Sequence, residues 1–280
     1  MKIGIITDST ASLELRGYTH PDIKIIDFSL SLDGVLYKIS EIDPNNFYKM
    51  MFAAKELPRT SQGTVADVLD IFSNFESEGY TDVFVMTVSA QLSGSFGNLL
   101  TASKEFESMN IHLIDSKTTA FILGDAVIET AKLIDLGKSV EEITSELGKM
   151  YDNDGVFFYV DSLRYLVKGG RISGAAGMVG QVFKIKPVLE ITDKGTIELV
   201  NKNRTKKKTL AMLLKMYHEK TDGRNHKLFA FFTDNEEEVK CFIEDIKNNE
   251  NVVDTYVTGL TPAVSAHAGG GVIGIGWRFV

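Results

Sequence analysis

Apolar runs of strand length alternate along the chain with segments in which apolar residues recur at helical spacing. In the first half, strands are predicted over residues 2–7, 82–88 and 111–114. In the second half, strands are predicted over residues 156–160, 187–191, 197–200, 227–233, 252–258 and 272–279. This alternation of the two periods is typical of an α/β protein.

Several predicted helices begin with residues that cap a helix N-terminus. The side chain of such a residue accepts a hydrogen bond from a backbone N–H group of the first turn, and proline suits the first helical position. The capping pairs are Asp43 with Pro44, Thr64 with Asp67, and Ser139 with Glu142. Two further amphipathic helices are predicted around residues 210–217 and 239–246, and a hairpin turn over residues 192–196.

A polar turn over residues 151–155 divides the predicted elements into two groups. We therefore predict two α/β domains, an N-terminal one over residues 1–155 and a C-terminal one over residues 156–280. No long linker separates them, so we expect the domains to pack closely and to leave a cleft between them.

Composition narrows the class of protein. The 280 residues are 44% hydrophobic and 24% charged, which is ordinary for a globular chain. A net charge of −8 argues against nucleic-acid binding. The N-terminus does not resemble a signal peptide and no apolar run is long enough to span a membrane, so we expect a cytoplasmic protein. The single cysteine, Cys241, lies among apolar residues at helical spacing, which predicts a buried thiol.

Common cofactor motifs are absent or incomplete. The chain has no P-loop, and Gly269, Gly271 and Gly274 match a dinucleotide-binding fingerprint only in their letters, because the chain ends too soon after them for the helix that the fingerprint requires. The five histidines do not have metal-ligand spacing. We therefore expect neither a metal nor a nucleotide cofactor.

Hydroxyl-bearing turns follow three predicted strands of the first half, over residues 7–10, 89–95 and 115–119, and a fourth polar loop spans residues 60–62. The carboxyl ends of parallel strands line one edge of a sheet, where ligands bind. Ser93 stands in a strand–turn–helix segment that presents free N–H groups to an anion. The alternative is that each loop only caps a helix.

Three other segments leave alternatives open. His267 lies in a run of small residues that permits close approach of a ligand, although a lone histidine is often structural. Arg204 could offer a charge to a carboxylate, but the basic run around it also fits a solvated helix start. Glycines recur at positions 174, 177 and 180, which fits either space for a slim apolar ligand or a close helix contact.

Together these motifs resemble the DegV family, bacterial proteins that bind long-chain fatty acids. The segment Gly169-Gly170-Arg171-Ile172-Ser173 is the most specific of them. The ordered set also includes residues 7–10, 58–62, 92–95, 115–116, 165–168 and 186–189, Arg204 and His267.

The resemblance implies two α/β domains with a tunnel for a fatty acid between them. It places the carboxylate contacts at Thr60 and Ser93, with Ser61 and the backbone of Gly94 beside them and His267 and Arg204 in a supporting network. It further implies a non-catalytic subunit that presents the bound acid to a separate ATP-dependent fatty acid kinase subunit, for phospholipid synthesis. No cofactor and no catalytic residue are implied, and transient membrane contact is compatible with this role.

Two other functions remain open at this stage. One is a stand-alone acyl-transfer enzyme with Ser93 or Ser95 as nucleophile and His267 as base, although no carboxylate is evident to orient the histidine. The other is a sensor for a small molecule that is not a lipid.

Overall fold

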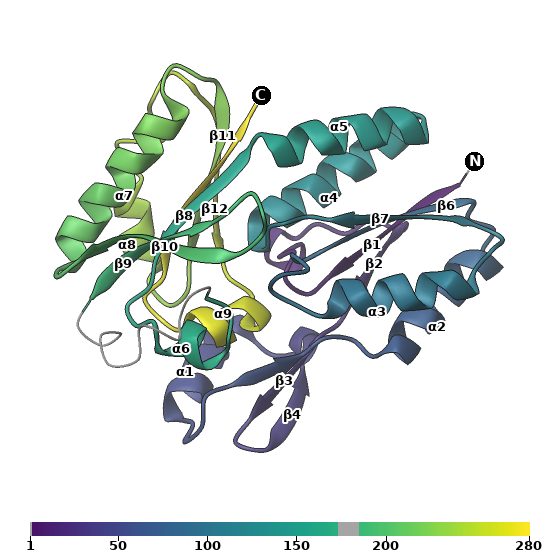
Figure 1. Ribbon diagram of the computed structural model, residues 1–280, viewed down its shortest axis with the longest axis horizontal. Coiled ribbons are helices and arrows are strands. Elements are labelled where there is room, and N and C mark those ends of the chain that lie inside the picture. Colours follow the sequence, from purple (N-terminus) through teal and green to yellow (C-terminus); the bar gives the residue numbers. More distant parts are fainter. Residues whose placement is uncertain (1, 173–184) are drawn as a thin grey trace.

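The strands of the computed structural model form two large sheets and one small sheet (Figure 1). The structure describes residues 2–172 and 185–280. The predicted mixed α/β fold is confirmed, and each strand predicted from an apolar run is present. The glycine repeat at positions 174, 177 and 180 lies outside the described residues.

The first large sheet is parallel, with the strand order β2-β1-β6-β7. Alternate residues of its central strands face opposite sides: Ile6 packs towards α2 and α3, and Ile5 towards α4 and α5. The elements are β1 (Ile3–Asp8), β2 (Ile23–Ile26), β6 (Asp82–Thr87), β7 (Asn110–Asp115), α2 (Val65–Ser77), α3 (Ser95–Ala102), η3 (Ser103–Glu105), α4 (Ala120–Asp135) and α5 (Val140–Asp152).

The second large sheet has the order β10-β9-β8-β13-β11-β12 and is antiparallel except for the pair β11–β12. On β8, Phe157 packs towards α7 and α8, whereas Phe158 faces the other side, towards the first sheet. The elements are β8 (Asp154–Tyr159), β9 (Lys186–Ile191), β10 (Ile197–Asn203), β11 (His226–Phe232), β12 (Val252–Gly259), β13 (Ile273–Phe279), α7 (Lys206–Thr221) and α8 (Glu236–Phe242).

A small antiparallel sheet, β4-β3-β5, and several short helices complete the fold. The sequence analysis did not predict these elements. They are η1 (Glu14–Arg16), β3 (Ser29–Leu32), β4 (Val35–Lys38), η2 (Ile39–Glu41), β5 (Arg59–Ser61), α6 (Arg164–Lys168) and α9 (Pro262–Ala268). The predicted helix at Pro44 is α1 (Pro44–Ala53).

Two of the predicted helix caps are confirmed in atomic detail. The Thr64 hydroxyl accepts the N–H of Asp67 at 3.1 Å, and the Ser139 hydroxyl accepts the N–H of Glu142 at 3.2 Å. The burial predicted for Cys241 is wrong, because its side chain is exposed. On α8 it is Val239 that faces the core, and a residue two positions later points to nearly the opposite side of a helix.

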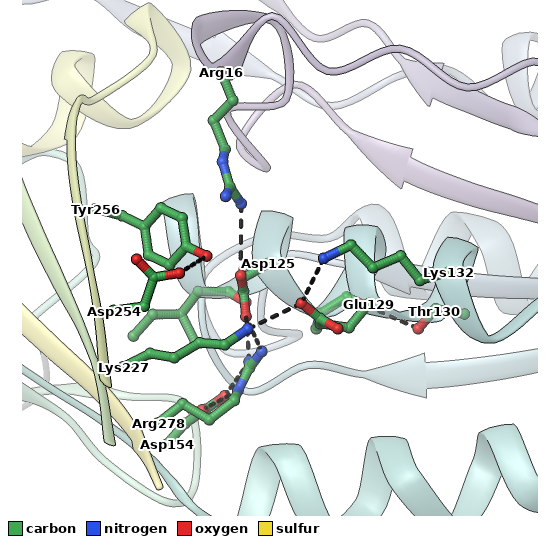
Figure 2. Close-up of polar contacts among 12 residues, drawn as sticks. Arg16, Asp125, Glu129, Thr130, Lys132, Asp154, Lys227, Asp254, Tyr256 and Arg278 are labelled. Carbon is green, nitrogen blue, oxygen red and sulfur yellow. Dashed lines mark hydrogen bonds and ion pairs between the residues drawn. The ribbon is translucent and has the colours of Figure 1, made fainter. Parts of the chain in front are cut away.

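Helix α4 lies between the two large sheets and packs on β1, β6 and β11. A cluster of buried charges, which we call the ion cluster, joins it to the second sheet (Figure 2). Arg278 donates to Asp154 at 2.6 and 2.8 Å and to Asp125 on α4 at 2.6 Å. Lys227 and Arg16 also pair with Asp125, at 3.3 and 3.6 Å. Through these contacts the two sheets are tied to the same helix.

Candidate functional site

A cavity of about 90 Å³ lies between the two large sheets. Both sheets and α4 contribute to its wall, and most of the lining side chains are apolar. Val88 directly follows β6 of the first sheet, Phe121 lies on α4, and Phe158, Ile191 and Phe231 come from the second sheet. The sheets therefore enclose a space suited to an apolar ligand.

Two polar residues that are far apart in the sequence meet in this cavity. The Oγ1 atom of Thr60, on β5, lies 2.6 Å from Nε2 of His267, on α9. Both residues line the cavity. The small sheet positions Thr60, because Leu30 on β3 pairs with it in register.

Strand alternation separates Thr60 from its neighbour Ser61. Successive side chains of a strand point to opposite faces, so Thr60 and Gln62 line the cavity while Ser61 is exposed. The structure therefore does not bring the Ser61 side chain to the cavity.

Ser93 lines the cavity from the loop between β6 and α3. Its Oγ atom accepts the N–H of Ser95 at 3.2 Å, which leaves its hydroxyl proton able to donate elsewhere. Gly94 is exposed and is not among the lining residues. A Cβ atom at this position would lie 2.7 Å from Nε2 of Gln62, so glycine permits close packing of this loop on the segment after β5.

The structure adds Arg171 to the residues of the cavity. Its guanidinium donates from Nε to the carbonyl oxygen of Leu92 at 3.2 Å and from Nη1 to that of Gly169. Among residues 2–172 and 185–280, no carboxylate forms an ion pair with it. The sequence signal was the Gly-Gly-Arg-Ile-Ser segment, which was singled out as a motif but to which no role was assigned.

Comparison with known proteins agrees with this fold. The profile of the DegV family matches residues 2–279. The chain belongs to the DegV family. A DegV domain-containing protein of Lactococcus lactis, YqaC, is 30% identical over 270 residues, which cover 96% of each chain.

Solved structures of DegV proteins superpose on nearly the whole chain. The fatty acid binding DegV family protein of Streptococcus agalactiae has a TM-score of 0.92 at 27% identity and covers 99% of each chain. DegV of Bacillus subtilis, described as a fatty acid binding protein, has a TM-score of 0.88 at 28% identity and covers 100% of each chain. A DegV family protein of Thermus thermophilus, whose fatty acid binding is described, has a TM-score of 0.89 at 26% identity, again over 100% of each chain.

Burial controls the charge of His267. Its burial, and to a smaller extent the positive charge of Arg171, lowers the pKa of the imidazole to about 4. His267 is therefore neutral near pH 7 and carries one ring proton. Burial also lowers the pKa of Arg171, although an arginine remains charged at physiological pH.

Arg204, part of the basic run that contributed to the DegV resemblance, lies away from the cavity. It is exposed, in the turn between β10 and α7, and is not among the lining residues. The next residue, Thr205, caps α7 by accepting the N–H of Lys208 at 3.3 Å. The structure therefore places this basic run at a solvated helix start.

The residues of a stand-alone serine enzyme are not assembled here. The hydrogen bond of His267 goes to Thr60, and Ser95 is buried in the first turn of α3. Among the described residues no carboxylate bonds to His267. Within the same ranges no group of acidic, histidine or cysteine side chains could hold a metal ion, and no helix is long and apolar enough to cross a membrane.

Proposed function

We propose that this protein binds a long-chain fatty acid in the cavity and holds its carboxylate at Thr60, Ser93, Arg171 and His267, which we call the head-group cluster. The observation that carries the proposal is Arg171, a half-buried cation beside a mostly apolar cavity, with no carboxylate partner among the described residues. Buried charges are normally paired. A ligand with one carboxylate and a long apolar tail would supply the missing charge and would contact the apolar wall of the cavity.

Contacts within the protein connect the members of the head-group cluster. Arg171 bonds to the carbonyl groups of Leu92, the neighbour of Ser93, and of Gly169. Gly169 in turn packs on His267, because a Cβ atom there would lie 2.7 Å from Nδ1 of the imidazole. His267 bonds to Thr60. These contacts therefore link the four residues, all of which line the cavity.

The ligand would fix the direction of the Thr60–His267 hydrogen bond. A carboxylate only accepts hydrogen bonds, so Thr60 must donate its hydroxyl proton to it. The Oγ1 atom of Thr60 then accepts from His267, which requires the neutral imidazole to carry its proton on Nε2. The lowered pKa of His267 supports this arrangement, since it keeps the ring neutral.

The two ends of the ligand would contribute differently. Each charge-assisted hydrogen bond to the carboxylate contributes about 1.5–3 kcal/mol. The tail contributes roughly 0.8 kcal/mol for each buried CH₂ group. Affinity would come mainly from the tail, and orientation from the head-group cluster. The related proteins from Streptococcus agalactiae, Bacillus subtilis and Thermus thermophilus, all described as binding fatty acids, support this ligand class.

We extend the proposal to a partner, a separate ATP-dependent kinase subunit that phosphorylates the bound carboxylate for phospholipid synthesis in the cytoplasm. Two observations support it. The chain has no P-loop of its own. Gly94, Gln91 and Ser61 are exposed beside the residues that line the head-group end, so the carboxylate would lie near the surface that a partner can reach.

Mass spectrometry of the lipids extracted from purified protein tests the ligand directly. We expect a long-chain fatty acid in the extract, and an absence of lipid even after loading would overturn the proposal.

For the site, Ser93→Ala is expected to weaken binding about 10-fold or more through loss of one charge-assisted bond. The matched control is Ser61→Ala, which removes an exposed hydroxyl outside the cavity and should leave affinity unchanged.

The hand-over is tested by mixing the loaded protein with ATP and a fatty acid kinase subunit of a Gram-positive bacterium. We expect acyl-phosphate only when all three are present. Acyl-phosphate formation by this chain and ATP alone would show an enzyme instead of a carrier. No product with any kinase subunit would leave a binding protein and overturn the partner proposal.

A further inference from the structure

The turn of the β9–β10 hairpin reaches from the second sheet to the first. The hydroxyl of Ser89, which follows β6, donates to the carbonyl oxygen of Gly195 at 2.8 Å. The turn is itself well ordered by hydrogen bonds, since Gly195 donates to Thr192 at 2.8 Å and Thr192 to Thr196 at 2.9 Å. The turn therefore contacts the first sheet as an ordered unit. The two contacting residues, Ser89 and Gly195, lie 106 positions apart in the sequence.

This contact leaves room only for glycine. Gly195 has a φ of +76°, and a Cβ atom there would lie 2.2 Å from Oγ of Ser89 and 3.0 Å from Cα of Lys117. Both the backbone conformation and the close approach exclude a side chain. Gly195 is buried in this position, where it packs against the loops after β6 and β7.

The segment after β7, against which the turn packs, has a strained backbone. Lys117 has a φ of +52° and Ala120 a φ of +56°, values that residues other than glycine rarely adopt. Such conformations persist where the surrounding structure holds them. Thr119 and Ala120 line the cavity. The hairpin turn thus rests on a strained loop that is part of the cavity wall.

The hairpin is also part of that wall. Ile191 and Ile197 are paired across β9 and β10 at the base of the turn, and both line the cavity. Ser89, which holds the turn, accepts the N–H of Ser93 through its own carbonyl group at 3.1 Å, so the contact lies close to the head-group cluster. Displacement of the turn would open the side of the cavity next to that cluster.

We propose that the contact between Ser89 and Gly195 is a latch, which holds the β9–β10 hairpin closed over the acyl chain and whose release opens a lateral path into the cavity. This inference rests on the proposed binding of a fatty acid. The acyl chain would lie between the two sheets, and the hydrogen bond from Ser89 to Gly195 joins the turn of this hairpin to the loop after β6 of the first sheet. The latch would therefore control the rates of fatty acid exchange more than the affinity.

The test compares Ser89→Ala and Gly195→Ala with the control Lys194→Ala, which changes an exposed side chain on the same turn. Ser89→Ala removes the hydrogen bond to Gly195 and also the one that Oγ accepts from the N–H of Gln91 at 3.2 Å. We therefore expect association and dissociation of a fluorescent fatty acid to accelerate about 2–10-fold. The dissociation constant should change less than either rate. Gly195→Ala adds a Cβ atom that displaces the turn from Ser89 and Lys117 while leaving both residues unchanged. It should accelerate exchange further. Lys194→Ala should exchange at the wild-type rate.

Hydrogen exchange of the hairpin amides, measured without ligand, gives an independent readout. We expect faster exchange in residues 186–203 of both latch variants, with an unchanged midpoint of global unfolding in Ser89→Ala. Wild-type rates of ligand exchange in both variants would overturn the latch, as would faster dissociation with unchanged association, which indicates a weakened wall and not an opened path. If the wild-type protein binds no fatty acid, the proposed function fails, whereas the amide exchange still decides whether the contact holds the hairpin.

Discussion

Arg278 and Arg171 are both withdrawn from solvent near the interface of the two large sheets, but their charges are balanced differently. Arg278, in the ion cluster, is 3% exposed and pairs with Asp125 and Asp154 (Figure 2). Arg171, in the head-group cluster, is half-buried and bonds only to backbone carbonyl groups among the described residues. The charge of Arg278 is balanced by carboxylates of the protein, whereas Arg171 has no counter-charge among residues 2–172 and 185–280.

In the proposed site, this difference separates a structural charge from a charge that a ligand would balance. A buried ion pair stabilises little in net terms, but removal of one partner is costly because the other charge remains buried. The ion cluster therefore maintains the relative position of α4 and the second sheet. A cation without a counter-charge beside an apolar cavity is costly until an anion binds, so in the proposed site Arg171 would favour the occupied state.

Arg278→Met is expected to have the largest effect on folding. It leaves Asp125 and Asp154 buried without their main counter-charge, which should lower the free energy of unfolding by about 3–5 kcal/mol. Urea denaturation followed by circular dichroism measures this. The control is Lys132→Met, which breaks an exposed pair with Glu129 and should cost less than about 1 kcal/mol. Equal losses in the two variants would contradict a structural role of the ion cluster.

Arg171→Met should act in the opposite way, with a large loss of binding and little loss of stability. Because a charge-assisted contact to the carboxylate is lost, affinity for a long-chain fatty acid should fall about 100-fold. Titration of delipidated protein measures it. Arg171→Lys keeps the charge and should recover part of the affinity. If Arg171→Met lowered the free energy of unfolding as much as Arg278→Met does, the contrast between the two arginines would be wrong.

The long strands were predictable from sequence because they are continuous apolar runs, buried on both faces, as in β1 and β6. The small sheet was not. β5 has three residues, two of them exposed, so its conformation depends on pairing with β3 and not on its own pattern. Helix α9 was missed because it is made of small residues that are buried on several sides, which gives no helical stripe.

The candidate site was partly predictable for a similar reason. Hydroxyl groups in a loop after a predicted strand indicated Ser93, and a separate polar loop over residues 60–62 contained Thr60. The family resemblance linked both residues to His267. The role of Arg171 depends on which groups are absent around it, and a sequence does not show that. Strand alternation would have separated Thr60 from Ser61, had β5 been recognised.

Thr60→Val tests a neutral member of the head-group cluster, where we expect a smaller effect than at Arg171. Valine keeps the shape of threonine but neither donates to the carboxylate nor bonds to Nε2 of His267. Affinity should fall about 10–30-fold, as expected for one lost bond of roughly 1.5–2 kcal/mol. Thr60→Ser retains the hydroxyl and should bind within about threefold of the wild type. If Thr60→Val bound as tightly as the wild type, the hydroxyl would not contact the ligand.

The pH dependence of stability gives the smallest effect and concerns the electrostatic coupling of His267 to Arg171. The pKa of His267 is lowered to about 4 in the folded protein, below the ordinary value of 6.5, by burial and by the charge of Arg171. Between these values the unfolded chain takes up a proton that the folded protein does not, so stability is lost as the pH falls through this window. From about pH 7 to about pH 5.5 the loss of stability should be on the order of 1 kcal/mol.

His267→Gln should lack this contribution to the pH dependence of stability. Arg171→Met should reduce the contribution, because one cause of the pKa shift of His267 is removed. Parallel pH profiles of the wild type and His267→Gln, measured by urea denaturation of delipidated protein, would show that His267 is not held neutral by this environment.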